Sequence, residues 1–156
     1  MGKFSHIDEK NKPKMDNVID KKVTKRRAAA QAIMFLGDEI VALLEGDEIS
    51  TKKGPVFQSA VIAGIQAVKR TADMIPMCHP LSLDGIDISI EVIDHSHISL
   101  LCSVEMEGKT GVEMEALSGV SIAALTVYDM CKAISQKMII KEVRLVEKTG
   151  GKSDFK

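Results

Sequence analysis

Residues 86–106 have the sequence IDISIEVIDHSHISLLCSVEM, and this stretch decides the fold class. On both sides of its centre at 94–97, apolar residues alternate with more polar ones. A period of two places successive side chains on opposite faces of a β-strand. The apolar set is Ile86, Ile88, Ile90, Val92, Ile98, Leu100, Cys102, Val104 and Met106. The stretch therefore predicts a β-hairpin with one face on a hydrophobic core and its turn at 94–97.

Segments on either side of the hairpin have a helical period instead. Apolar residues recur at spacings of three and four from Phe57 to Val68 and again from Met114 to Tyr128. Gly37 to Leu44 predicts a shorter helix, and the β-branched stretch from Met138 to Val146 predicts a closing strand. The stretch from Arg26 to Leu36 is ambiguous, because its alanines favour a helix by propensity. Helices combined with an antiparallel hairpin predict an α+β fold.

Composition limits the class of protein. The 156 residues suit one domain, and we expect a flexible arm over residues 1–14 followed by a single domain over residues 15–156. With a formal net charge of −1 and 3% aromatic residues, the chain offers little to attract or stack nucleic acid. No apolar run approaches the roughly 18 residues that span a membrane. The three cysteines form no CxxC pair, which suits a reducing compartment, so we expect a cytoplasmic protein.

Standard phosphate-binding loops are missing. Gly108-Lys109-Thr110 and Gly151-Lys152-Ser153 resemble the end of a P-loop, but the first glycine that a P-loop requires falls on Ser103 and on Val146. No GxGxxG motif is present either. Nucleotide binding by either standard loop is therefore not expected.

Two polar groups beside the first long helix have structural explanations. Cys78-His79 is flanked by Pro76 and Pro80, and on spacing alone a turn that ends the helix explains the pair better than a metal site. No further Cys or His lies at ligand spacing, so we expect no metal. Lys52-Lys53-Gly54, before the helix, is explained equally well as a solvated turn.

Polar residues in the second long helix leave more than one interpretation open. Thr110 and Glu113 have the spacing of a capping box, which explains Glu113, whereas Glu115 has no explanation as simple. Asp129 and Lys132 are i, i+3 neighbours on one helix face. They form either a surface ion pair or a carboxylate and an amine tuned for proton transfer.

Several longer segments together resemble one known family. They are KKGPVF at 52–57, IAGIQAVKRTADMIPMCHPL at 62–81, GKTGVEMEAL at 108–117, LTVYDMCKA at 125–133 and RLVEKTGGKSDFK at 144–156. These segments look like the signatures of the C protein family of molybdenum cofactor biosynthesis, and the resemblance runs from about residue 5 to the end. It implies that residues 26–36 form a strand. It also implies a ferredoxin-like fold, an antiparallel sheet with helices on one face, as one catalytic domain.

The resemblance also implies a reaction and an assembly. The substrate is expected to be 3′,8-cyclised 7,8-dihydro-GTP, and the product cyclic pyranopterin monophosphate, with pyrophosphate released. No metal or organic cofactor is expected for the chemistry, although magnesium can accompany the phosphates. The expected assembly is a homo-oligomer, a hexamer built as a trimer of dimers.

Roles follow residue by residue from the same resemblance. The expected catalytic residues are Lys53, Asp129 and Lys132. The expected substrate-binding residues are Met77, Cys78, His79, Glu113, Met114, Glu115, Lys148, Lys21 and Arg26. The two catalytic lysines can donate protons to leaving groups, or accept protons where desolvation lowers their pKa. Asp129 can hold Lys132 in place.

The second long helix sets a geometric problem for these roles. Glu115 and Asp129 lie roughly 21 Å apart along its axis at about 1.5 Å per residue, unless the helix breaks near Gly119. That is too far for both to act on one reacting centre. We therefore expect shared active sites, in which one subunit supplies the groups around Glu115 and a neighbour those around Asp129.

Two other functions are compatible with the predicted fold. A non-catalytic regulatory module that binds a small molecule needs only the fold, but it does not require so many acidic and basic groups together. An RNA-binding domain would need exposed aromatics on the sheet and a basic face, and the hairpin offers neither.

Overall fold

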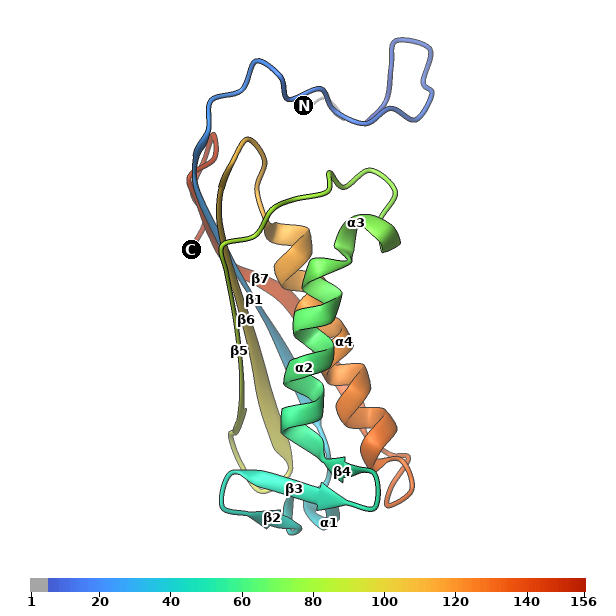
Figure 1. Cartoon of the computed structure of the whole chain (residues 1–156). Helices are drawn as coiled ribbons and strands as arrows, with labels where there is room; N and C mark the ends of the chain where they lie inside the picture. Colours follow the sequence, from blue (N-terminus) through green and yellow to red (C-terminus); the bar gives the residue numbers. More distant parts are fainter. Residues whose placement is uncertain (1–5) are drawn as a thin grey trace.

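Four long strands form one antiparallel sheet in the computed structural model of this chain, which describes residues 6–156 (Figure 1). They are β1 (Thr24–Phe35), β5 (Gly85–Val92), β6 (His97–Gly108) and β7 (Ile139–Thr149). Their order across the sheet is β5-β6-β1-β7, and every neighbouring pair is antiparallel. The hairpin and the closing strand predicted from the sequence are confirmed.

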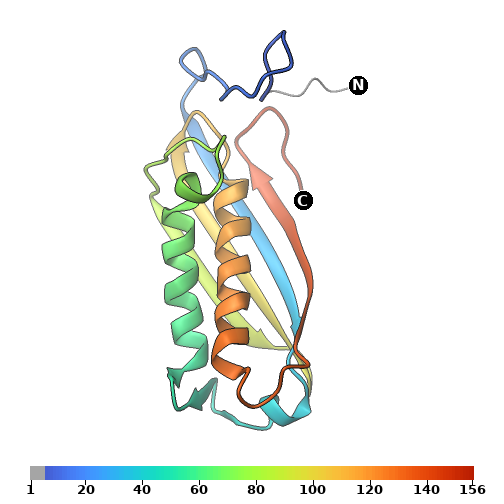
Figure 2. The same ribbon diagram turned by 90° about the vertical axis from the view of Figure 1, so that its right-hand side faces the viewer.

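Two long helices, α2 (Val56–Lys69) and α4 (Glu113–Cys131), cover one face of this sheet. Figure 2 shows them side by side in front of the strands, α2 in green and α4 in orange. A short helix, α3 (Thr71–Met74), follows α2. The four sheet strands and two long helices therefore alternate as β-α-β-β-α-β along the chain. This is the ferredoxin-like α+β arrangement that the sequence predicts.

The alanine-rich stretch is a strand, β1, as the family resemblance implies. Ala28, Ala30, Ala32 and Met34 are fully buried on the face beneath the helices. The strand pairs along its whole length with β6 and along most of it with β7. Pairing on both edges outweighs the modest helix propensity of alanine, and the small side chains let α4 approach the sheet.

Glycines bring the two helices and the sheet into close contact. A Cβ on Gly64 of α2 would lie 2.9 Å from the backbone oxygen of Gly119 on α4 and 2.6 Å from Ile88 Cδ1. A Cβ on Gly119 would lie 2.7 Å from Cys102 Sγ on β6. Since no Cβ fits at either position, these glycines set how closely the layers pack.

A second, smaller sheet lies at one end of the molecule. It contains β2 (Leu44–Glu45), β3 (Glu48–Thr51) and β4 (Gly54–Pro55), and a short helix, α1 (Asp38–Val41), precedes it. The helix predicted over 37–44 is therefore too long. The helix α1 ends at Val41. Gly46, with a φ of 65°, makes the turn between β2 and β3.

The predicted capping box at the start of α4 is wrong. The residue that caps the helix is Val112, and no side chain hydrogen-bonds the free N–H groups there. A capping box needs its acidic residue at the third helical position, whereas Glu113 is the first. Glu113 instead pairs with Lys148, at 3.3 Å.

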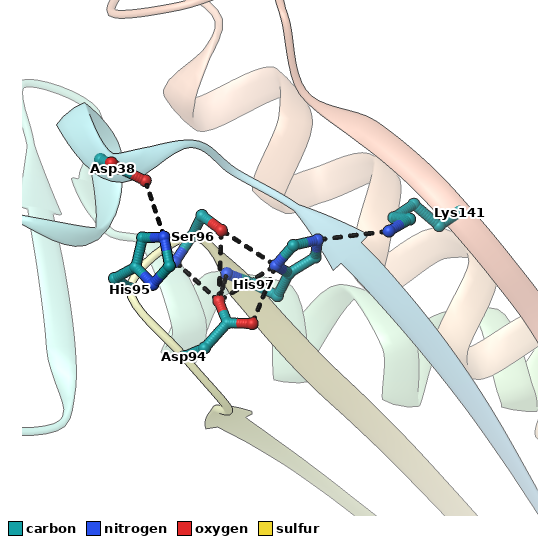
Figure 3. A network of polar contacts seen from close by, with 6 residues as sticks. All are labelled: Asp38, Asp94, His95, Ser96, His97 and Lys141. Atoms are coloured by element: carbon teal, nitrogen blue, oxygen red, sulfur yellow. Dashed lines mark hydrogen bonds and ion pairs between the residues drawn. The ribbon is translucent and has the colours of Figure 1, made fainter.

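The tip of the β5–β6 hairpin is fixed by one carboxylate (Figure 3). Asp94 Oδ1 accepts hydrogen bonds from the backbone N–H groups of Ser96 and His97, each at 2.8 Å. These bonds, together with His97 Nδ1 at 3.0 Å, lower the pKa of Asp94 to about 2. The Ser96 carbonyl in turn accepts the N–H of Leu36 at 2.8 Å. The network therefore ties the hairpin turn to the end of β1.

The first described residues, from residue 6 on, and the end of β7 lie at the opposite end of the molecule from the small sheet (Figures 1 and 2). Residues 1–5 of the expected N-terminal arm lie outside the described residues. Residues 6–14 are mostly exposed and contain a turn closed by pairing between Ile7 and Pro13. The flexibility of this arm stays a prediction, as does a single catalytic domain over residues 15–156.

Candidate functional site

A hollow of about 510 Å³ opens at the end of the molecule where α4 begins. The N-terminal segment, the loop after α3, the turn before α4 and the end of β7 all contribute to it. All nine residues predicted to bind substrate line this single hollow. They are Lys21, Arg26, Met77, Cys78, His79, Glu113, Met114, Glu115 and Lys148.

Basic side chains outnumber carboxylates in the lining of the hollow. The Arg26 guanidinium is oriented by the backbone oxygens of Gly108 and Lys109, to which it donates at 3.4 and 3.3 Å. Lys148 Nζ lies 3.3 Å from Glu113 Oε1, and its side chain is 34% exposed. Partly exposed cations from several segments can neutralise the charge of a bound phosphate group.

One wall of the hollow carries two acidic groups whose pKa values are raised by burial, which favours their protonated forms. Glu115 is only 4% exposed, and burial, aided by the charge of Glu113, raises the pKa of its carboxyl. Burial also raises the pKa of the neighbouring Cys78 thiol, to which the Glu115 charge adds. Protonated groups can donate hydrogen bonds to a ligand, which a carboxylate or a thiolate cannot do.

The N-terminal segment crosses the hollow and contacts its side chains through backbone oxygens. His79 Nε2 lies 2.8 Å from the backbone oxygen of Asp16. Lys109 Nζ donates to the backbone oxygen of Ile19 at 2.7 Å. Lys21 pairs with Asp16 at 2.8 Å, and this hydrogen bond lowers the pKa of the Asp16 carboxyl. His79 therefore contacts the N-terminal segment across the hollow and is not only part of the turn that follows the helix.

The three predicted catalytic residues form a separate cluster at the other end of α4. Asp129 Oδ2 lies 2.8 Å from Lys53 Nζ, and Asp129 Oδ1 lies 2.7 Å from Lys132 Nζ. Lys53 comes from the turn between β3 and β4, whereas Asp129 is in the last turn of α4 and Lys132 is the residue that caps it. Lys53 Nζ also donates to the backbone oxygen of Asp129 at 3.0 Å.

The opposite charges in this cluster stabilise each other's ionised forms. Hydrogen bonds from Lys132 and Lys53 lower the pKa of Asp129 to about 2, so its carboxylate is ionised at neutral pH. The same contact with Asp129 raises the pKa of Lys132. About half of each of the three side chains is exposed. The contact with Asp129 therefore favours the protonated ammonium of Lys132, and whether this lysine acts as an acid or as a base stays a prediction.

The two groups of residues do not meet within one chain. α4 runs unbroken from Glu113 to Cys131, so the break near Gly119 does not occur. Glu115 and Asp129 are thus held roughly 21 Å apart along its axis. Figure 1 shows the two ends of α4, one near the C-terminal end of the chain and the other beside β4.

Sequence reasoning missed several residues of the hollow. Lys109 and Lys152 line it, and both stand in the glycine-flanked stretches that fail as P-loops. Thr110 Oγ1 also belongs to it, and among residues 6–156 it is a buried side-chain oxygen with no hydrogen-bond partner. A basic residue between glycine and a hydroxyl residue was a usable signal for an anion site. Nothing in the sequence indicates the contacts of Asp16.

Neither a metal-binding cluster nor a membrane-spanning helix occurs in the part of the chain that the structure describes. Across residues 6–156, no three His, Cys, Asp or Glu side chains lie close enough to share a metal ion. In the same residues, no helix is both long and apolar enough to cross a membrane.

The chain is thus an α+β protein of the ferredoxin-like class, with a hollow lined by cations at one end of α4 and a lysine–aspartate cluster at the other. Residues 15–151 match the model of the MoaC family, and the chain belongs to that family. It is 50% identical over 156 residues to the cyclic pyranopterin monophosphate synthase of Lysinibacillus sphaericus, covering 98% of this chain and 96% of that protein. The synthase of the same name from Campylobacter jejuni is 49% identical over 152 residues, covering 97% and 96%.

A longer relative contains a region of the same kind. The molybdenum cofactor biosynthesis bifunctional protein of Synechocystis is 52% identical over 155 residues, which covers 97% of this chain. The chain spans 45% of the length of that protein.

Proposed function

We propose that the hollow and the lysine–aspartate cluster, at opposite ends of α4, are two halves of one active site. The chain is a cyclic pyranopterin monophosphate synthase of molybdenum cofactor biosynthesis. The observation that carries this function is the family match over residues 15–151, within which nine expected substrate-binding residues line a single hollow.

The proposed substrate is 3′,8-cyclised 7,8-dihydro-GTP. In its conversion an imidazole-derived ring opens and a pyrazine ring closes. A hydroxyl oxygen then bonds to the α-phosphorus, the bond from that phosphorus to the leaving oxygen breaks, and pyrophosphate departs. Lys21, Arg26 and Lys148 in the hollow suit the binding of this triphosphate. Such cations also stabilise the charge that develops as pyrophosphate leaves. Magnesium can accompany the phosphates, and no other cofactor is proposed.

Proton transfers are assigned to the lysine–aspartate cluster. Lys132 keeps its proton at neutral pH because Asp129 raises the pKa of its ammonium, so it can protonate a leaving nitrogen or oxygen. Lys53 brings a second ammonium to the other oxygen of the same carboxylate. Asp129 holds both amines at fixed positions and is too acidic to serve as a base itself.

Completion of the site requires more than one subunit. The separation along α4 supports a homo-oligomer in which the hollow of one subunit faces the cluster of a neighbour. A hexamer built as a trimer of dimers is the proposed assembly, and analytical ultracentrifugation tests it. The proposal places the protein in the cytoplasm, where its three cysteines stay reduced, and cell fractionation tests this location.

Direct turnover is the experiment that tests the function. Purified chain, treated with a chelator and supplied again with magnesium, is mixed with the cyclised dihydro-GTP compound. We expect cyclic pyranopterin monophosphate and pyrophosphate to appear together in equal amounts, measured by chromatography. A folded preparation that yields neither product would contradict the function. Activity that only zinc or iron restores would contradict the proposed chemistry without a metal cofactor.

A further inference from the structure

The loop that carries Lys53 is closed at its base by the carboxylate of Glu48. Glu48 is the first residue of β3, and α2 begins just after β4. Its Oε1 accepts the backbone N–H of Phe57 at 2.8 Å, and its Oε2 accepts that of Gln58 at 3.0 Å. Oε1 also accepts the N–H of Ile49 at 2.7 Å. One side chain thus ties the first strand residue of the loop to the first turn of the helix that follows it.

The Glu48 carboxylate supplies the hydrogen-bond acceptors that the start of α2 otherwise lacks. The residue that caps α2 is Pro55, and it offers no side-chain acceptor. The first N–H groups of a helix need acceptors and favour a negative charge. Burial alone would raise the pKa of Glu48, but the hydrogen bonds from Phe57, Gln58 and Ile49 keep it below its ordinary value. The side chain of Glu48 therefore carries its negative charge at the start of α2, where free N–H groups favour one.

Hydrogen bonds continue from this base to the tip of the loop. Thr51 Oγ1 accepts the backbone N–H of Lys53 at 3.2 Å and donates to the backbone oxygen of Gly54 at 3.3 Å. Lys53 lies midway between Glu48 and Phe57, and its Nζ reaches Asp129 on α4. Apart from these contacts and the Glu48 carboxylate, the β3–β4 pairing that holds the loop is short and involves two residues of each strand.

We infer that Glu48 is a positioning residue, whose carboxylate fixes the base of this loop so that the Lys53 ammonium meets Asp129. The inference rests on the proposed catalytic role of Lys53. Glu48 touches neither the hollow nor the lysine–aspartate cluster, so it acts on the reaction only through Lys53.

The matched variants are Glu48→Gln and Asp47→Asn. Glutamine keeps the size of the side chain but replaces one acceptor oxygen with an NH₂ group that faces backbone N–H groups. Asp47 is the neighbouring, exposed carboxylate and is the control for a lost charge. We expect Glu48→Gln to lower kcat about ten-fold, because a displaced catalytic group costs up to ~100-fold. KM should change by less than about two-fold, as for an interaction made only in the transition state. Asp47→Asn should match the wild type.

Combining variants shows whether the effect passes through Lys53. In a Lys53→Ala background, Glu48→Gln should lower kcat by no more than about two-fold, since residues that act as a unit are non-additive. An equal ten-fold loss in both backgrounds would overturn the inference. A lower melting temperature with unchanged kcat for the folded enzyme would also overturn it, because Glu48 would then only support the fold.

A second measurement is independent of turnover. The side-chain carboxyl carbon of Asp129 can be titrated by NMR, starting from a pKa of about 2 that Lys132 and Lys53 hold down. Glu48→Gln should raise the pKa of Asp129 toward the value found in Lys53→Ala. The pKa of Asp129 in the double variant should equal that in Lys53→Ala. If Lys53→Ala proves fully active, the proposed function of Lys53 fails while this titration still tests its positioning. Should Glu48→Gln not fold, Glu48→Asp, which keeps the charge on a shorter side chain, is expected to raise the pKa by less. An unchanged Asp129 pKa in a folded Glu48 variant contradicts the inference.

Discussion

Glu115 and Asp129 lie on the same helix, yet their surroundings displace the pKa values of their carboxyl groups in opposite directions. Burial raises the pKa of Glu115, whereas two ammonium groups lower that of Asp129 to about 2. Titratable groups whose pKa values are shifted in opposite directions are typical of active sites. This difference supports the proposed roles, in which Glu115 hydrogen-bonds the substrate and Asp129 holds the two lysines proposed to be catalytic.

The first prediction concerns those lysines. Lys53→Ala and Lys132→Ala should each lower kcat by about 10²- to 10⁴-fold, the usual contribution of a positioned acid or base. Both side chains are about half exposed, so both variants should melt close to the wild-type temperature. Steady-state kinetics and calorimetry on the same preparations check this. Variants that melt normally and keep near wild-type activity would show that the catalytic assignment is wrong.

A second prediction follows from the raised pKa of Glu115. A carboxyl whose pKa is higher in the folded state stabilises the fold at low pH and loses that contribution as the pH rises through the folded-state pKa. Glu115→Gln removes the buried charge and should raise the free energy of unfolding at pH 7 by about 1 kcal/mol. The gain should shrink as the pH falls from the raised pKa of Glu115 toward the ordinary carboxyl pKa, and it should be lost below that value. Urea denaturation at several pH values measures it, and a gain that does not vary with pH would show that the buried charge is not its cause.

At the scale of elements, periodic stretches were predictable and short or irregular ones were not. The hairpin, α2 and α4 follow from alternation and helical spacing, because each is long enough to show its period. β1 needed the family resemblance, since alanine does not distinguish a buried strand from a helix. The strands of the small sheet have two to four residues each and show no period at all. The contacts of Glu48 join residues through backbone N–H groups, which no side-chain pattern reveals.

The third prediction belongs to the contact between α2 and α4. Gly64→Ala would place a Cβ 2.9 Å from the Gly119 backbone oxygen, and a backbone atom cannot move aside cheaply. Overpacking of this kind costs about 1–3 kcal/mol, which exceeds the gain of up to ~1 kcal/mol in helix propensity. Gln66→Ala, at an exposed position on the same helix, is the control and should stay within about 0.5 kcal/mol. Urea unfolding measures both, and a stabilised Gly64→Ala would refute the packing argument.

For the whole molecule, the sheet and its two helices hold the hollow and the lysine–aspartate cluster apart. The hollow depends on the N-terminal segment and the end of β7, while the lysine–aspartate cluster depends on the small sheet. The sequence predicted this separation, because helix rise converts residue spacing into distance. It did not predict that the N-terminal segment lines the hollow, since its contacts there join backbone oxygens to side chains from distant segments. A single chain thus carries both halves of the proposed site without joining them.

The last prediction tests whether neighbouring subunits join these halves. Glu115→Ala impairs the hollow, and Lys132→Ala impairs the cluster, so each variant alone should be inactive. Dissociating the two variants and reassembling them together creates mixed interfaces. If one subunit's hollow meets the neighbour's cluster, some mixed interfaces contain an intact hollow beside an intact cluster, and activity should return to a measurable fraction of the wild type.

Controls for this experiment use the same variants. Each variant dissociated and reassembled alone should stay inactive, which excludes recovery by refolding. A Glu115→Ala, Lys132→Ala double variant mixed with either single variant should also stay inactive, because no interface can then combine two intact halves. Subunit exchange is followed by fluorescent labels on the two chains. Variants that exchange subunits freely and never regain activity would show that Glu115 and Lys132 serve the same chain's site. The roughly 21 Å between the ends of α4 would then have to be bridged by a change in the fold rather than by a partner.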